Sequence, residues 1–190
     1  HYASQIGSES LRNLMYPLDW ENLAAYVGLP AILKDISGVG DRRVFFVNSV
    51  EELIQAYDST GELCMILQEY IETDHFVHCF CIGLERALAV PYDPNEQCYV
   101  IDEQPAMQDA LYRQIIDYTQ QLNRALGYDV NCVEFAIQNG TPYAIDMLNP
   151  APEIDVNRMT PRHFDWMVQA LADFAIQSAF APNQCPYLTA

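Results

Sequence analysis

Lys34 is the first residue whose type and position indicate chemistry. It is the single lysine of the chain and ends the apolar run 29–34, just before a loop that carries Gly38 and Gly40. A compact ammonium beside backbone N–H groups that glycine leaves uncovered suits a phosphate group. The alternative is a solvated strand end, because isolated lysine and glycine signals have low specificity. Lys34 is therefore a candidate phosphate ligand.

Two acidic residues lie on neighbouring predicted strands, 131–137 and 142–148, which flank the hairpin signal Asn139-Gly140. Strand alternation puts Glu134 on the face opposite Val133, between small residues. An odd-length loop or a β-bulge would set Asp146 directly across from it. Facing carboxylates repel unless a cation lies between them, and Mg²⁺ takes one or two carboxylates plus waters and phosphate oxygens. With the amide of Asn149 they form a candidate Mg²⁺ site, the alternative being a solvated outer face.

The elements that would position these residues alternate between hairpins and helices. Asp19 is a predicted cap of a helix that ends before Gly28, and Ser49 with Glu52 predicts a capping box. Further strands are expected at 43–47, 64–71, 77–82 and 86–90, and 91–105 is expected to be irregular. Longer helices are predicted over 111–126 and 164–180. The pattern predicts an α+β protein of antiparallel hairpins backed by helices.

Composition excludes several classes of partner. The chain has 190 residues, 51% of them hydrophobic, and a formal net charge of −17, so it should fold as one domain or two small lobes. The negative electrostatic field of the molecule repels phosphate backbones and anionic lipid. No apolar run is long enough to span a bilayer. We therefore expect a soluble, cytoplasmic protein that binds neither nucleic acid nor a membrane.

The cysteines do not indicate a metal or redox site. None of the six has CxxC spacing, and most lie in apolar, strand-like runs. We expect buried structural thiols.

These segments, in this order, resemble the ATP-grasp superfamily over about residues 20–180, and the RimK-type carboxylate–amine ligases in particular. The resemblance rests on 29–34, the glycine loop 37–40, Leu67-Gln-Glu-Tyr-Ile71, and Val133-Glu134 followed by Gly140 to Pro150. It implies an ATP-grasp fold with two α+β lobes of antiparallel sheet and helices that enclose a nucleotide cleft. The implied division is an N-terminal arm (1–18), a small lobe (19–70) and a large lobe (71–190).

The resemblance also implies roles for individual residues. Lys34 and the loop with Gly38 and Gly40 would hold the ATP phosphates, and Mg²⁺ would bind Glu134, Asp146 and Asn149. The inter-lobe hinge would read adenine through backbone groups and ribose through an acidic side chain, and its residues are Gln68, Glu69, Tyr70, Ile71, Glu72 and Asp74. No catalytic side chain is assigned.

Two departures from the family pattern concern the site. The usual acid and asparagine are two residues apart, whereas Asp146 and Asn149 are three apart, so a bulge is required for both to face a metal. Basic residues of the family are replaced here by His78 and by Tyr92, next to Pro91.

The expected activity is ATP- and Mg²⁺-dependent ligation of a small-molecule carboxylate to an amine through an acyl phosphate. The alternatives are a nucleotide-binding module without catalysis and a grasp-fold kinase. The family has an additional N-terminal lobe that carries part of the acceptor site. We therefore expect a missing N-terminal lobe or a homo-oligomer.

Overall fold

The computed structural model describes residues 17–36, 44–61, 63–100 and 109–180. The chain divides into two compact units, His1–Tyr70 and Ile71–Ala190. Gly38 and Gly40 lie outside the described residues. Each unit contains an antiparallel sheet with helices, which confirms the predicted α+β class.

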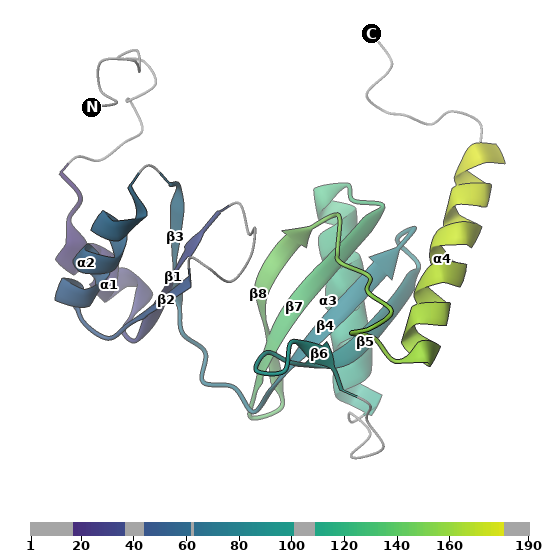
Figure 1. The fold of residues 1–190 in the computed structure, drawn as a ribbon, viewed down its shortest axis with the longest axis horizontal. Coiled ribbons are helices and arrows are strands. Elements are labelled where there is room, and N and C mark those ends of the chain that lie inside the picture. Colours follow the sequence, from purple (N-terminus) through teal and green to yellow (C-terminus); the bar gives the residue numbers. More distant parts are fainter. Residues whose placement is uncertain (1–16, 37–43, 62, 101–108, 181–190) are drawn as a thin grey trace, which may run out of the picture. The chain divides into compact units, whose positions relative to one another are not determined.

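The first unit is a three-stranded sheet with two helices (Figure 1). The sheet order is β2-β1-β3, with both neighbouring pairs antiparallel. The elements are α1 (Trp20–Val27), β1 (Ala31–Asp35), β2 (Val44–Val47), α2 (Val50–Thr60) and β3 (Met65–Glu69). The predicted strand 64–71 is thus shorter at both ends.

Side-chain and glycine caps explain where these two helices begin and end. Asp19 accepts a hydrogen bond from Asn22 N at 3.1 Å, and Gly28 closes α1 at φ +93°. Ser49 caps α2 by accepting from Glu52 N at 3.2 Å. The predicted capping box is wrong in one detail, because the Glu52 carboxylate accepts from Asn48 N, one residue before the cap.

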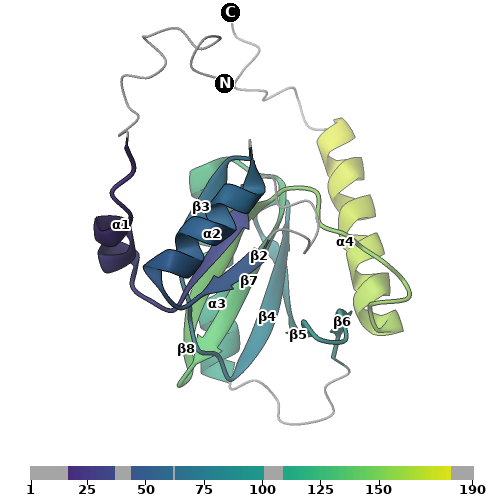
Figure 2. The same cartoon turned by 60° about the vertical axis from the view of Figure 1, so that its left-hand side comes forward.

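The second unit is a five-stranded sheet with the order β6-β5-β4-β7-β8, all pairs antiparallel. Its strands run side by side in both views (Figures 1 and 2). The strands are β4 (His75–Ile82), β5 (Arg86–Asp93), β6 (Cys98–Tyr99), β7 (Val130–Gln138) and β8 (Thr141–Asn149). The helices are α3 (Asp109–Leu126) and α4 (Pro161–Phe180).

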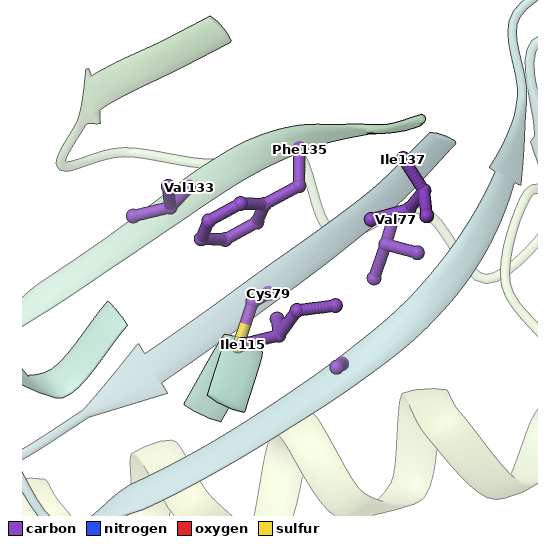
Figure 3. Close-up of a cluster of buried hydrophobic side chains, with 7 residues drawn as sticks. Val77, Cys79, Ile115, Val133, Phe135 and Ile137 are labelled. Atoms are coloured by element: carbon purple, nitrogen blue, oxygen red, sulfur yellow. The ribbon is translucent and has the colours of Figure 1, made fainter. Parts of the chain in front are cut away.

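Both faces of this sheet are covered, each by a different helix. On one face α3 contributes Ile115 to a cluster with alternate residues of β4 and β7 (Figure 3). On the other face α4 packs Met167 and Ala170 against Phe80, Ile82 and Cys132. Residues that alternate along β7 therefore enter two separate cores.

The prediction that 91–105 is irregular is wrong in part over 91–100, and 101–105 lie outside the described residues. β5 continues to Asp93, and the side chain of Asp93 accepts from Asn95 N at 2.8 Å, which closes a turn into β6. Tyr92 then pairs with Tyr99 across the two strands. The strand β6 is only two residues long, and such a short segment has no periodicity to detect.

Three of the five cysteines within the described residues follow the expectation of buried thiols, and Cys185 lies outside those residues. Cys79, Cys81 and Cys132 are buried free thiols, Cys98 is half-buried, and Cys64 is exposed. Burial raises the pKa of Cys79 to about 12 and also raises the pKa of Cys132. Among the helices of the described residues, none combines the length and apolar character needed to cross a bilayer.

Candidate functional site

Lys34 lies on the face of the small sheet that its helices leave open. Leu33 points to the opposite face, into the core with α1 and α2. Lys34 pairs with Val44 on one side and Ile66 on the other, and these two are 51% and 39% exposed. Lys34 therefore has two partly exposed apolar register partners on this face of the sheet.

The open face continues toward the end of β3. Ile32 pairs with both Phe46 and Gln68, so all three share the face of Lys34. The Phe46 and Tyr70 rings meet edge to face with centroids 4.9 Å apart. This face of the sheet therefore combines aliphatic and aromatic side chains with the side chain of Lys34 on the central strand.

The residues predicted to read adenine and ribose have diverse surroundings. Glu69 pairs with Ala31 and lies on the helix-covered side of the register. In the other unit, Asp74 accepts from Asn139 N at 3.0 Å, and the carbonyl of Glu72 accepts from Gln138 Nε2 at 2.8 Å. Asp74 thus stabilises the β7–β8 turn, and its ribose contact, like the roles of Ile71 and Glu72, stays a prediction.

Glu134 and Asp146 are register partners across β7 and β8. The hairpin loop has two residues, Asn139 and Gly140, both with positive φ, as a tight hairpin turn requires. Phe135 pairs with Ala144, so Ile145 is an extra residue in β8 between that pair and the Glu134–Asp146 pair. This bulge, which the sequence predicted as one of two possibilities, sets the carboxylates opposite each other.

A second irregularity brings Asn149 to the same face. Cys132 pairs with Asn149. Between this pair and the pair Glu134–Asp146, β8 advances by three residues while β7 advances by two. Because Cys132 and Glu134 point to one face, Asn149 shares that face with Asp146. The Asp146 carboxylate also accepts from Leu148 N at 3.2 Å inside the bulge.

His78 extends the row of polar side chains across β4. It pairs with Glu134, and its Nε2 lies 3.8 Å from Glu134 Oε2, which is longer than a hydrogen bond. The imidazole stacks on Tyr92 with centroids 4.1 Å apart, and its Nδ1 is 3.2 Å from the Tyr99 hydroxyl. When Nδ1 accepts this bond, the ring proton is on Nε2 and faces Glu134.

Burial sets the charge of this group. Desolvation lowers the pKa of His78 to about 4, and the opposing effect of the Asp146 carboxylate is smaller. Burial likewise raises the pKa of Tyr99. At neutral pH His78 is therefore an uncharged hydrogen-bonding group beside the two acids.

Comparisons with solved structures identify the architecture. D-alanine–D-alanine ligase of Bacillus anthracis, complexed with ATP, matches 87% of this chain and 56% of its own length, with TM-score 0.66 and 18% identity. The biotin carboxylase–β,γ-ATP complex of Campylobacter jejuni covers 86% of this chain and 40% of its own, with TM-score 0.63 and 20% identity. N5-carboxyaminoimidazole ribonucleotide synthetase of Thermus thermophilus matches with TM-score 0.58 and 21% identity, over 80% of this chain and 41% of its own.

The chain has the ATP-grasp fold. It spans little more than half the length of the first matched enzyme. No protein-family model matches the sequence, and no curated protein matches it. The resemblance to the RimK type within the ATP-grasp superfamily stays a prediction.

The donor set of this chain fits Mg²⁺ and does not fit zinc. Two facing carboxylates and one amide offer only oxygen, which Mg²⁺ prefers, and leave positions for phosphate oxygens and water. Within the described ranges, no three His, Cys, Asp or Glu side chains come together as a complete metal site. Phosphate oxygens and water would complete the coordination of Mg²⁺ here.

Sequence reasoning missed two residues of this region, Tyr99 and Asn131. Tyr99 lies in the stretch expected to be irregular, although the turn residues at 93–96 followed by an apolar run were an available signal. Asn131 is completely buried, and an asparagine at the start of an apolar strand was the signal for it.

Proposed function

We propose that this chain is the nucleotide-binding part of an ATP- and Mg²⁺-dependent carboxylate–amine ligase. The proposal rests on the pairing of Glu134 with Asp146 across a β-bulge, with Asn149 on the same face, in a chain that has the ATP-grasp fold. Two carboxylates in register repel each other, and such an arrangement is favourable when a cation joins them.

The chain's own residues have distinct tasks in this proposal. Lys34, next to the loop with Gly38 and Gly40, binds the triphosphate, and the apolar face around Ile32 and Phe46 receives the base. Glu134, Asp146 and Asn149 would hold Mg²⁺, which would supply positive charge to the phosphates. The adenine and ribose contacts are assigned to the segment 68–74.

The proposed reaction has two balanced steps. A carboxylate oxygen of the substrate attacks the γ-phosphorus of ATP, ADP leaves, and an acyl phosphate forms. An amine then attacks the acyl carbon, inorganic phosphate leaves with the C–O bond electrons, and the amine proton passes to solvent or a base. Neighbours of this fold that are named as ligases support the C–N bond-forming class.

One observation favours a nucleotide-binding module without catalysis as the second candidate. His78 occupies a position where the family pattern has a basic residue, and burial keeps it uncharged at neutral pH. A transferred phosphoryl group would therefore lack a fixed positive charge from this side chain.

Nucleotide binding is tested by thermal melting with and without Mg-ATP. Because a ligand that binds only the folded state raises its melting temperature, the parent protein should show an upward shift. Lys34→Met, which keeps the apolar stem, should remove most of the shift. Arg124→Ala, which removes one exposed positive charge from α3, is the matched control and should retain it. Equal shifts in the two variants would assign Lys34 to ordinary surface charge.

Product analysis separates the candidate reactions. A ligase releases ADP in the presence of a carboxylate and yields a hydroxamate when hydroxylamine replaces the amine, because hydroxylamine traps an acyl phosphate. A kinase gives a stable phosphorylated alcohol and no hydroxamate. Mg-ATP binding with no ADP release across a panel of carboxylates, amines and alcohols would support the non-catalytic module.

A further inference from the structure

Asn131 is a buried amide that contacts β8 at the irregularity before Asn149. The residue has no solvent exposure and lies in β7 next to Cys132. Its Nδ2 donates to Met147 O and to Asn123 Oδ1, each at 2.9 Å, and its Oδ1 accepts from Asn149 N at 2.9 Å. One side chain thus bonds β8 on both sides of Leu148.

These bonds replace ladder bonds that the bulge disrupts. From the pair Glu134–Asp146 to the pair Cys132–Asn149, β8 contains one residue more than β7. An extra residue leaves backbone groups of the bulged strand without their regular cross-strand partners. The carboxamide is suited to the position because it offers both donors and an acceptor, which no apolar side chain of similar size does.

The direction of the Asn149 side chain depends on this extra residue. Side chains alternate along a strand, so residues three apart point to opposite faces when the strand is regular. If the bulge were lost, a one-residue slip would turn Asn149 away from the face of Asp146 and bring Leu148 to it. The exposed Leu148, at 59%, has no core contact to prevent the slip.

We propose that Asn131 is a positioning residue, which holds the β8 bulge so that Asp146 and Asn149 present their oxygens to one Mg²⁺. The role of Asn131 toward Mg²⁺ rests on the proposed function, whereas its stabilisation of the β8 bulge does not. Asn131 itself does not contact the metal; it acts through the backbone of Met147 and Asn149.

The first test compares Asn131→Leu with Asn123→Leu. Both positions are completely buried asparagines of the same hydrogen-bonded pair, so both variants should lose stability. Only Asn131→Leu removes the bonds to β8. In Asn131→Leu, amide hydrogen exchange at Asn149 should therefore accelerate by more than the global loss of stability explains. In Asn123→Leu, the protection of the Asn149 amide should change only as much as global stability does.

The second readout is the effect of Mg²⁺ on binding of a non-hydrolysable ATP analogue, given as the ratio of Kd without Mg²⁺ to Kd with it. Changes in residues that orient metal ligands typically cost 10- to 100-fold in metal affinity, so this ratio should fall by about tenfold or more in Asn131→Leu. Asn123→Leu should keep the parent ratio within about twofold, since the metal-facing groups are unmoved.

A rescue variant gives the sharpest test. Deleting Leu148 makes the segment between Asp146 and Asn149 regular, so the two side chains share a face without a bulge. The double variant, Asn131→Leu with Leu148 deleted, should therefore regain most of the Mg²⁺ effect on nucleotide affinity. A merely structural Asn131 predicts no rescue.

The outcomes separate this proposal from the proposed function. If the amide exchange rate of Asn149 is unchanged in Asn131→Leu, Asn131 does not stabilise the bulge, whether or not nucleotide binds. Fast exchange with an unchanged Mg²⁺ ratio, or a double variant that folds but is not rescued, overturns the positioning role. If the parent protein does not bind the nucleotide with Mg²⁺, the proposed function is overturned, and with it the role of Asn131 toward the metal. The hydrogen-exchange rate at Asn149 still decides whether Asn131 stabilises the bulge.

Discussion

Replacing His78 by phenylalanine should flatten the pH dependence of stability in the second unit. Phenylalanine keeps a ring to stack on Tyr92, but it cannot titrate. The pKa of His78 is about 4 in the folded protein against an ordinary value of 6.5. Between these values the unfolded chain binds a proton that the folded chain does not, so stability is complete above pH 6.5 and falls as the pH falls toward 4.

The magnitude follows from proton linkage. For pKa values of about 4 folded and 6.5 unfolded, lowering the pH from about 7.5 to about 5 costs about 2 kcal/mol of unfolding free energy from this one group. His78 is 8% exposed, so little solvent screening reduces the effect. The parent should lose about 2 kcal/mol more than His78→Phe across that pH range.

Urea unfolding followed by tryptophan fluorescence measures this difference. Trp166 packs in the core that α4 forms in the second unit, and Trp20 lies in the first unit, so a Trp20→Phe background makes the signal specific. Tyr99→Phe is the control: it removes the hydroxyl next to Nδ1 but leaves the imidazole, so it should lower stability at every pH and keep a pH dependence. If parent and His78→Phe differ by the same free energy at both pH values, the buried neutral histidine is refuted.

Three further predictions address the metal, a turn and a helix cap. Asp146→Asn should weaken Mg²⁺-dependent ATP binding in calorimetry yet leave metal-free stability within about 1 kcal/mol, because it relieves like-charge repulsion; matching affinities would remove Asp146 from the metal site. Gly83→Ala should cost about 1–3 kcal/mol in urea unfolding, because a Cβ there would meet Phe174 Cδ2 at 2.8 Å; Gly61→Ala, with similar φ and open space, isolates the backbone cost, and equal losses would contradict the clash. Ser49→Ala should cost about 1 kcal/mol through lost capping of α2, and an unchanged unfolding midpoint would contradict this.

Local signals predicted most elements of this fold. Asp19 and Gly28 bracket α1, and Asn139-Gly140 forms the two-residue turn of β7 and β8, since each depends on side chains within a few positions. The two lobes of antiparallel sheet were expected only from the resemblance, and the order of the strands within each sheet was not predicted. β1 pairs with β3 across the whole of α2, and no local pattern encodes such pairing.

The candidate site was predictable where strand alternation and spacing were sufficient. The three-residue separation of Asp146 and Asn149 required a bulge, and the register contains one. The neutral state of His78 was beyond sequence reasoning, because burial lowers its pKa and the rings around it come from β5 and β6. Asn131 was missed for a similar reason: its partners are the backbone of β8 and a side chain of α3.

The buried thiols make the two faces of the large sheet separately measurable. Cys79 lies in the core under α3, and Cys132 lies in the core under α4. A maleimide reacts with accessible thiolates, so burial and a raised pKa protect both, while the exposed Cys64 reacts at once. Pulse alkylation read by peptide mass spectrometry would thus time the opening of each core on its own. Detachment of α4 would modify Cys132 before Cys79, and detachment of α3 would reverse the order.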